Sequence, residues 1–439
     1  MKLLKKHLQT SVAIALAAAS FAVSAKTTVT IGTVNNGDMV RMKELSPAFE
    51  KANPDIKLEW VILEENVLRQ RLTNDIATKG GQFDLMLIGM YEAPIWGEKG
   101  WLEPMTGLPA SYDLDDVFDS VKDGLSHDGT LYALPFYAES SMTMYRKDLF
   151  DKVGMPMPAK PTWDFMYEAA SKIHDPANEV YGACLRGKPG WGDNMAFITT
   201  VANSFGAQWF GMDWKPQFDT PEWKDALTFY VDLLTKYGPP GAANNSFNEN
   251  LALMNAGKCG FWVDATVAGS FVTGKDSTVA DKMAFAPAPY KVTEKGSGWL
   301  WSWALGIPQT SDSKEAAKKF AAWATSKEYM ALVAEKEGIA NTPPGTRKSL
   351  YANPAYMAEA SFAAMTLEQM NKANPQDSTL NENPYTGVQF VAIPAFQGVG
   401  ATVGQLFSGA LAGKSSVDEA LADAQKATTR EMKRAGYIK

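Results

Sequence analysis

Residues 83–88 read FDLMLI, a run in which every residue except Asp84 is apolar. A strand that is buried on both faces has this composition, whereas a strand with one solvent-facing side alternates apolar and polar residues. Strands of the first kind belong to parallel sheets that are covered by helices on both faces. The run therefore predicts an α/β domain, in which strands and helices alternate along the chain.

The segments before this run show that alternation. Residues 29–34 and 56–62 alternate apolar and polar side chains, as half-buried strands do. Residues 38–49 and 68–76 repeat apolar side chains at helical spacing, with Asp38 as the expected N-cap of the first helix and Pro47 as a bend or boundary within it. This order of elements is that of a doubly wound α/β domain.

The same alternation returns later in the chain, after residue 180. A short strand that contains Ala183 is expected to end at Arg186, and further strands are expected at 258–263 and 303–308. Helices are expected at 223–234, 316–323 and within the alanine-rich stretch 410–424. A chain of 439 residues exceeds one ordinary core, so two domains are expected. Because no Pro/Ser-rich linker separates the two parts, we expect several chain crossings between two lobes.

Residues 1–25 have the composition of a secretory signal peptide. A basic head precedes the apolar run 11–21, and the small residues Val23, Ser24 and Ala25 form a cleavage site. The apolar run is too short to span a bilayer comfortably. We therefore expect export, cleavage after Ala25 and a soluble mature protein in the periplasm of a Gram-negative cell.

Charge and cysteine content narrow the class of protein further. Removal of the three lysines among residues 1–25 changes the formal net charge from −7 to −10, and an acidic protein binds nucleic acid poorly. The two cysteines, Cys184 and Cys259, could pair in an oxidising compartment. The sequence does not show whether their Cα atoms lie close enough for a disulfide.

The residues needed for common catalytic and metal chemistry do not occur in the required patterns. His127 and His174 have neither metal-ligand spacing nor a neighbouring nucleophile motif, and no glycine-rich phosphate loop is present. We therefore expect no catalytic residue, no metal and no cofactor. A secreted glycoside hydrolase that uses two carboxylates remains the enzymatic alternative.

Aromatic residues beside polar groups are frequent at the ends of the predicted strands. The chain has 13 tryptophans and 15 tyrosines, and residues 296–308 read GSGWLWSWALGIP, with tryptophan at every second position. In an extended strand these three indoles share one face, so they either pack in the core or form an aromatic wall for a ligand. Ligands bind beyond the carboxyl ends of strands in open α/β sheets, and flat apolar faces flanked by polar groups suit carbohydrate-like molecules.

The chain resembles the extracellular solute-binding proteins of ATP-driven carbohydrate importers, the maltose-binding-like group. The resemblance covers essentially the whole mature chain and rests on AFEKANPDIKLEW (48–60), FDLMLI (83–88), the stretch 127–166, LMNAGKCGFWVDA (253–265), the stretch 303–326 and GIANTPPGTR (338–347). Binders of linear polyols such as mannitol and sorbitol are most similar in TVNNGDMVRM (33–42), CLRGKPGWGDN (184–194) and GSGWLWSWALGIP (296–308).

This resemblance implies a two-lobed periplasmic-binding-protein fold of the α/β class with three hinge crossings. Lobe one would comprise 26–135 plus 303–341, lobe two 140–298 plus 347–439, and the hinges would lie near 136–140, 299–302 and 341–347. The lobes would close over a ligand bound between them. The ligand-binding residues would be Asn36, Asp38, Glu65, Tyr91, Glu139, Arg186, Trp191, Asp193, Asp264, Trp299 and Trp301.

Within this set, Glu139, Arg186 and Asp264 are expected to bind ligand hydroxyls, the alternative being an ion pair between the lobes that involves Arg186. A change of chain direction at the hinge should leave Trp303 in the core and turn only Trp299 and Trp301 toward the cleft. The implied function is a monomeric, non-enzymatic importer component that passes a small linear polyol to the permease subunits in the membrane. A monosaccharide or an oligosaccharide is the alternative ligand.

Overall fold

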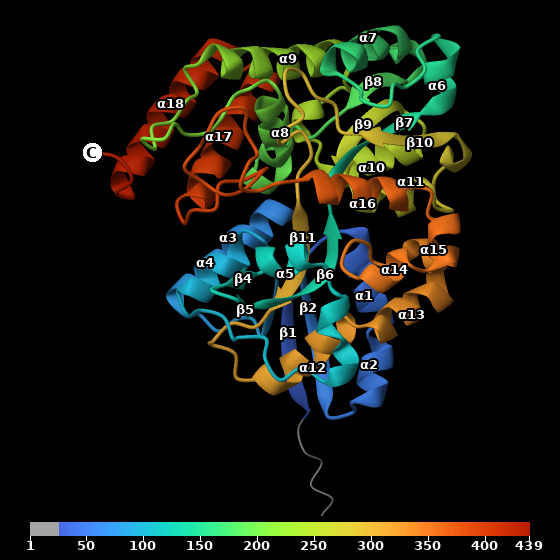
Figure 1. Cartoon of the computed structure of the whole chain (residues 1–439), viewed down its shortest axis with the longest axis vertical. Helices are drawn as coiled ribbons and strands as arrows, with labels where there is room; N and C mark the ends of the chain where they lie inside the picture. The colour runs from blue at the N-terminus through green and yellow to red at the C-terminus, as the bar shows by residue number, and fades with distance from the viewer. Residues whose placement is uncertain (1–25) are drawn as a thin grey trace, which may run out of the picture.

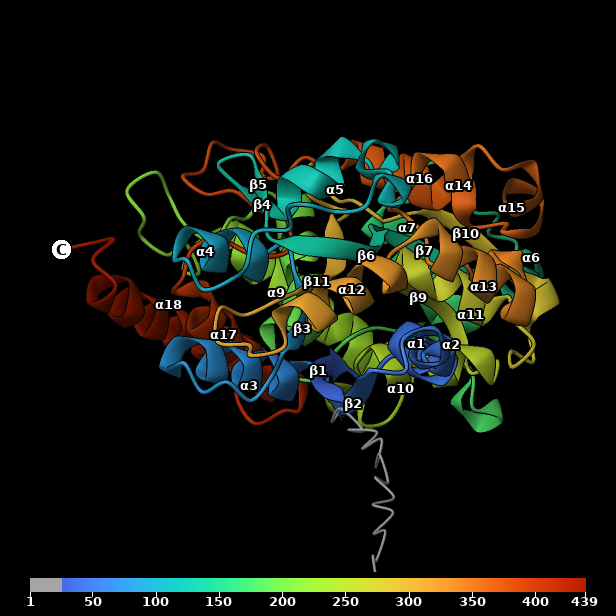
Figure 2. The same ribbon diagram turned by 90° about the horizontal axis from the view of Figure 1, so that it is seen from below.

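Strand β3 (Leu85–Gly89) lies in the middle of a five-stranded sheet in the computed structural model, which describes residues 26–439. All five of its residues are buried. The sheet has the order β2-β1-β3-β11-β6, in which β1 (Thr27–Val34) runs parallel to β2 (Ile56–Leu63) and to β3. The predicted parallel arrangement is confirmed for these three strands, and they follow one another in the view from below (Figure 2).

The helices between these strands fall where the apolar spacing predicts them, and the boundary expected at Pro47 is confirmed. Pro47 begins a separate helix α2 (Pro47–Ala52) after α1 (Gly37–Leu45), because proline lacks the amide hydrogen that a continuous helix would need. The side chain of Asn36, and not that of Asp38, caps α1 by accepting a hydrogen bond of 2.9 Å from Met39 N. Helices α3 (Glu65–Thr78) and α4 (Glu92–Glu98) follow β2 and β3.

A four-stranded sheet forms the core of the other half of the molecule. Its order is β10-β7-β9-β8, with strands β7 (Ser141–Arg146), β8 (Tyr181–Cys184), β9 (Cys259–Ala265) and β10 (Met283–Pro287). Strand β8 ends at Cys184, two residues before the predicted end, because the chain turns so that Gly187 N and Lys188 N bond to Asn245 O. A disulfide joins Cys184 to Cys259 with a Cα–Cα distance of 5.8 Å, which answers the question that the sequence leaves open.

The chain passes between the two sheets more than once, and each sheet lies in a separate half of the molecule (Figure 1). Strand β6 (Ala133–Glu139) belongs to the five-stranded sheet and β7 to the four-stranded one, and the chain returns from β10 to β11 (Trp301–Gly306). We call the part around the five-stranded sheet the first lobe and the part around the four-stranded sheet the second lobe. The residue limits of lobes and hinges given above remain predictions.

Helices cover both sheets, and several differ in extent from their predicted ranges. Helix α9 (Pro221–Tyr237) exceeds 223–234 at both ends. The stretch 410–424 is divided between α17 (Phe396–Leu411) and α18 (Val417–Arg434), because Gly413 adopts the left-handed conformation and Ser416 caps α18. The remaining elements are β4 (Ser126–His127), β5 (Thr130–Leu131), α5 (Asp119–Gly124), α6 (Lys147–Lys152), α7 (Trp163–Ile173), α8 (Ala196–Ser204), α10 (Phe247–Asn255), α11 (Gly269–Val272), α12 (Lys314–Ala324), α13 (Lys327–Glu337), α14 (Lys348–Tyr351), α15 (Pro354–Glu359) and α16 (Ala363–Lys372).

The predicted signal peptide, residues 1–25, lies outside the described residues. Among residues 26–439, no helix is both long and apolar enough to cross a bilayer.

Candidate functional site

Two adjoining cavities lie between the first and the second lobe. The larger has a volume of about 570 Å³, its open mouth included, and the smaller about 330 Å³. Both are lined by Glu65, Glu139, Arg186 and Trp303, so they form one continuous site.

Nine of the eleven residues that the sequence predicts for ligand binding line these cavities. They are Asn36, Asp38, Glu65, Glu139, Arg186, Trp191, Asp193, Trp299 and Trp301. Asn36 and Asp38 follow β1, and Arg186 follows β8, so the polar groups gather at strand ends as expected. Contact of these side chains with a ligand remains a prediction.

Asp264 does not line either cavity and holds Arg186 in place instead. Its Oδ2 accepts hydrogen bonds from Arg186 Nε at 2.8 Å and from Trp262 Nε1 at 2.9 Å, and Oδ1 accepts from Arg186 Nη2 and Ala265 N. The carboxylate has no exposed surface. The prediction that Asp264 itself binds hydroxyls is therefore corrected, and the ion pair that replaces it lies within the second lobe rather than between the lobes.

Tyr91 also lies outside the cavities. Its hydroxyl donates to Ile393 O at 3.1 Å and accepts from Gln397 N at 3.0 Å, so its polar atom is already bonded within the protein. The ring packs on Trp191 with a centroid distance of 5.1 Å. Tyr91 therefore supports the cavity wall from behind.

Four tryptophans, Trp191, Trp299, Trp301 and Trp303, line the smaller cavity, and we call them the indole wall. Trp303 is buried in the core, as expected, but it also lines both cavities, because β11 begins at Trp301 and residues two apart in a strand share a face. The rings of Trp301 and Trp303 meet edge to face at 5.4 Å. The indole nitrogens of Trp299 and Trp301 are buried and have no hydrogen-bond partner among residues 26–439, so both N–H groups are unsatisfied within this part of the chain.

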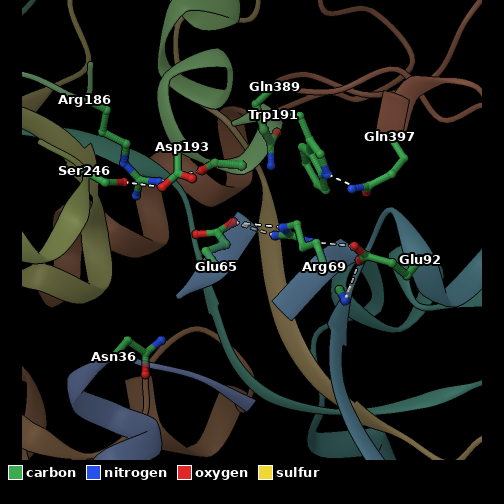
Figure 3. A network of polar contacts seen from close by, with 12 residues as sticks. Asn36, Glu65, Arg69, Glu92, Arg186, Trp191, Asp193, Ser246, Gln389 and Gln397 are labelled. Atoms are coloured by element: carbon green, nitrogen blue, oxygen red, sulfur yellow. Dashed lines mark hydrogen bonds and ion pairs between the residues drawn. The ribbon is translucent and has the colours of Figure 1, made fainter. Parts of the chain in front are cut away.

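Arg69, which the sequence analysis does not single out, lies against this wall. Its guanidinium carbon is 4.0 Å from the ring centroid of Trp191, 4.6 Å from that of Trp303 and 5.0 Å from that of Trp301. Carboxylates hold it on the other sides: Nη2 donates to Glu65 Oε1 at 2.8 Å and Nη1 to Glu92 Oε1 (Figure 3). The i, i+4 spacing of Glu65 and Arg69 is a signal that could have found the first of these pairs.

Other lining residues complete the polar surface of the site. Ser246 Oγ donates to Asp193 Oδ1, and Asn36 Nδ2 donates to Tyr137 Oη at 2.8 Å. Ser246 and Tyr137 both line the larger cavity. The capping-box motif with Glu249 marks Ser246 only as the start of helix α10, and no local motif indicates its bond to Asp193 or that of Tyr137 to Asn36, because these partners are far apart in the sequence.

Burial shifts the protonation of two carboxyl groups in the site. Glu139 is 5% exposed, and burial raises its pKa well above the usual range, although the nearby Arg186 acts in the opposite direction. Burial, together with the negative charge of Glu65, raises the pKa of Asp193 to about 7. Oε2 of Glu139 has no hydrogen-bond partner in the described part of the chain. The cavity can thus offer both donor and acceptor groups to a polar, uncharged molecule.

Comparison with known proteins identifies the family. Residues 36–331 match the family model described as bacterial extracellular solute-binding protein. The chain belongs to this family. As a solute-binding protein it has the two-lobed α/β fold that the resemblance implies, so that prediction is confirmed.

Some similar proteins are named for a polyol ligand or have one bound in their crystal structure. The solute-binding protein described here is 62% identical to a mannitol-binding protein of Pseudomonas aeruginosa, over 94% of each chain. A crystal structure of an ABC transporter solute-binding protein from Agrobacterium vitis with bound D-mannitol is 62% identical, with a TM-score of 0.93, and covers 94% of this chain and 100% of that one. The fold is shared by a solute-binding protein from Agrobacterium radiobacter in complex with ribitol, which is 23% identical with a TM-score of 0.81. The match covers 92% of this chain and 99% of that one.

The lobes of this solute-binding protein are in direct contact beside the cavity. Lys188 Nζ of the second lobe lies 3.1 Å from Glu64 Oε2 of the first, and Asn248 Nδ2 donates to Asn35 O at 2.8 Å. The stacking of Arg69 on Trp191 also joins the two lobes. The structure therefore has the lobes closed over the site.

No group of three or more His, Cys, Asp or Glu side chains within residues 26–439 is arranged to hold a metal ion. The site combines carboxyl, guanidinium, amide and hydroxyl groups with an indole wall. It can bind a small molecule rich in hydroxyl groups.

Proposed function

We propose that this solute-binding protein captures a linear polyol of the D-mannitol type between its lobes. The observation that carries the proposal is the combination of 62% identity and a TM-score of 0.93 with a protein whose crystal structure contains D-mannitol. The closed cavity supports it, because its carboxyl, guanidinium and indole N–H groups match the alternating donors and acceptors of a polyhydroxylated chain.

The energetics of such binding are reasonable for a molecule of this size. A hexitol has about twelve heavy atoms, so micromolar affinity, about 8 kcal/mol, requires about 0.7 kcal/mol per atom. That value lies below the ceiling of about 1.5 kcal/mol per atom for the best small ligands. Closure of the two lobes would bury most of the ligand and remove competing water.

We further infer the setting in which the protein acts. It would work in the periplasm after removal of residues 1–25, as a monomer without catalytic activity, and would deliver its ligand to the membrane subunits of an ATP-driven importer. The family to which the chain belongs, which is named for extracellular solute binding, supports this role. Opening and closing would occur about the three predicted hinges.

A thermal-unfolding panel tests the proposal. A ligand that binds only the folded protein raises its stability by about 2.7 kcal/mol at a concentration of one hundred times Kd. D-mannitol, D-sorbitol and a pentitol should therefore raise the melting temperature of ligand-free protein by several degrees, whereas D-glucose and maltose at equal concentration should not. A shift with maltose and none with the hexitols would reject the polyol ligand.

A further inference from the structure

The cavity between the lobes is strongly acidic. Its two parts are lined by the carboxylates of Asp38, Glu64, Glu65, Glu139, Asp193 and Glu249, against the two guanidinium groups of Arg69 and Arg186. The question is which of these charges are balanced inside the protein and which are left for a ligand.

Each basic group near the cavity is already paired with a carboxylate. Arg186 is paired with Asp264, and Arg69 lies between Glu65 and Glu92. The remaining pairs join Arg41 to Asp38 and Lys188 to Glu64. Glu249 accepts a hydrogen bond from Ser246 N in the capping box of α10, where the helix dipole also favours a negative charge.

Two lining carboxyl groups, Glu139 and Asp193, have no ion-pair partner among residues 26–439. Both are almost fully buried, at 5% and 3% exposure. Asp193 accepts one hydrogen bond from Ser246 Oγ, and Oε2 of Glu139 has no partner in the described chain. A buried carboxylate without a counter-ion is costly, so each group must either take up a proton or receive a cation.

We propose that the site also binds amino-polyols, in which a protonated amine replaces a hydroxyl, and that it excludes the corresponding sugar acids. This inference rests on the proposed function, because it assumes that polyols enter the same cavity. An ammonium group would supply the positive charge that Glu139 and Asp193 lack. A sugar acid would add a further carboxylate to a site with an excess of them.

The surroundings of the two carboxyl groups favour the same assignment. Glu139 on β6 faces the negative groups Asp38 of α1, Glu65 of α3 and Asp264 of β9, against the single positive group Arg186. Asp193 faces Glu65, with Arg186 and Lys188 acting in the opposite direction. The pKa of Asp193, raised to about 7, and the raised pKa of Glu139 mean that the closed site holds protons when its ligand is neutral.

The two ligand classes should therefore respond to pH in opposite ways. Binding of neutral D-mannitol takes up protons, so its affinity should fall as pH rises, by about tenfold between pH 6 and pH 8 for one group with a pKa of about 7 in the closed state and an ordinary pKa in the open state. An amino-polyol pairs with the ionised carboxylates and should not lose affinity over this range. The ratio of amine to mannitol affinity should rise about tenfold.

Calorimetric titration of the full mature protein tests this inference with D-mannitol, 1-amino-1-deoxy-D-mannitol and D-mannonate at pH 6 and pH 8. We expect the affinity ratio to rise as stated, D-mannonate to bind at least about tenfold more weakly than D-mannitol at pH 8, and proton uptake to accompany mannitol alone. Proton uptake is measured from the binding enthalpy in two buffers of different ionisation enthalpy. Asp193→Asn should reduce the rise of the ratio, whereas Glu368→Gln on the exposed face of α16 should leave it unchanged.

A pH-independent ratio, or D-mannonate that binds as tightly as D-mannitol, would overturn the inference. Failure of the amine to bind would also overturn it, whether or not D-mannitol binds. Failure of D-mannitol alone, with the amine bound, would instead contradict the proposed function and leave the amine class supported.

Discussion

Replacement of Arg186 by methionine is expected to weaken D-mannitol binding by about 10- to 150-fold, the range that corresponds to one charge-assisted hydrogen bond of about 1.5–3 kcal/mol. A guanidinium group has five N–H donors. Three are used inside the protein, two on Asp264 and one on Gly192 O at 2.7 Å. The other two remain for a ligand, because Arg186 lines both cavities.

The Arg186→Met variant needs a control that separates loss of binding from loss of stability. Removal of the arginine leaves Asp264 buried and unpaired, which costs about 3–5 kcal/mol of folding free energy. Calorimetry must therefore be carried out where the variant is still folded. Lys236→Met removes another cation of the second lobe, but one whose partner Asp232 lies on the same helix α9, and neither residue lines either cavity. It should change affinity less than twofold, and equal affinities for Arg186→Met and the unmodified protein would contradict the role of Arg186.

The second large effect is expected for Arg69→Met, which should lower the free energy of unfolding by about 3–5 kcal/mol. The substitution leaves Glu92, which is 3% exposed, without its cationic partner. It also removes the guanidinium from the rings of Trp191, Trp301 and Trp303, where desolvated cation–π contacts contribute about 2 kcal/mol or more. Chemical denaturation followed by circular dichroism measures the change.

Arg71→Met is the matched control for this variant. Arg71 lies in the same helix α3, and its exposed guanidinium makes one hydrogen bond of 3.3 Å to Gln82 and lies 5.4 Å from the ring centroid of Phe83, a single contact with one ring against three rings for Arg69. Its replacement should change stability by no more than about 0.5 kcal/mol. Equal losses of stability in the two variants would contradict the prediction, because the contacts of Arg69 with Glu92 and the tryptophans would then add nothing to the free energy of unfolding.

The layout of the fold could be predicted largely from local patterns. The apolar run before Gly89 and the alternation of residues 29–34 identify strands whose partners are set by general rules of α/β sheets. Details that depend on side-chain competition could not be predicted in this way. Asn36 rather than Asp38 caps α1, and Asp38 is instead paired with Arg41 one turn later in the helix.

The site was harder to predict than the fold, because its side chains choose partners across the whole molecule. The sequence gives no sign that Asp264 has a partner, but it forms an ion pair with Arg186, which is 78 residues away. Tyr91 bonds to Ile393 O, 302 residues away. Trp303 is buried as expected, but its place in the cavity lining could not be predicted, since the strand begins earlier than expected and the alternation continues through it. The resemblance to a family predicted where the site lies, and tertiary contacts decide which side chains face it.

Titration of the mature protein with D-mannitol, after bound ligand has been removed by unfolding and refolding, tests the central claim most directly. We expect one binding site per chain and a dissociation constant in the micromolar range or tighter. Tryptophan fluorescence should change as the ligand covers the indole wall. No heat of binding at millimolar D-mannitol, together with saturable binding of D-glucose or maltose, would contradict the claim that the cavity is built for a linear polyol.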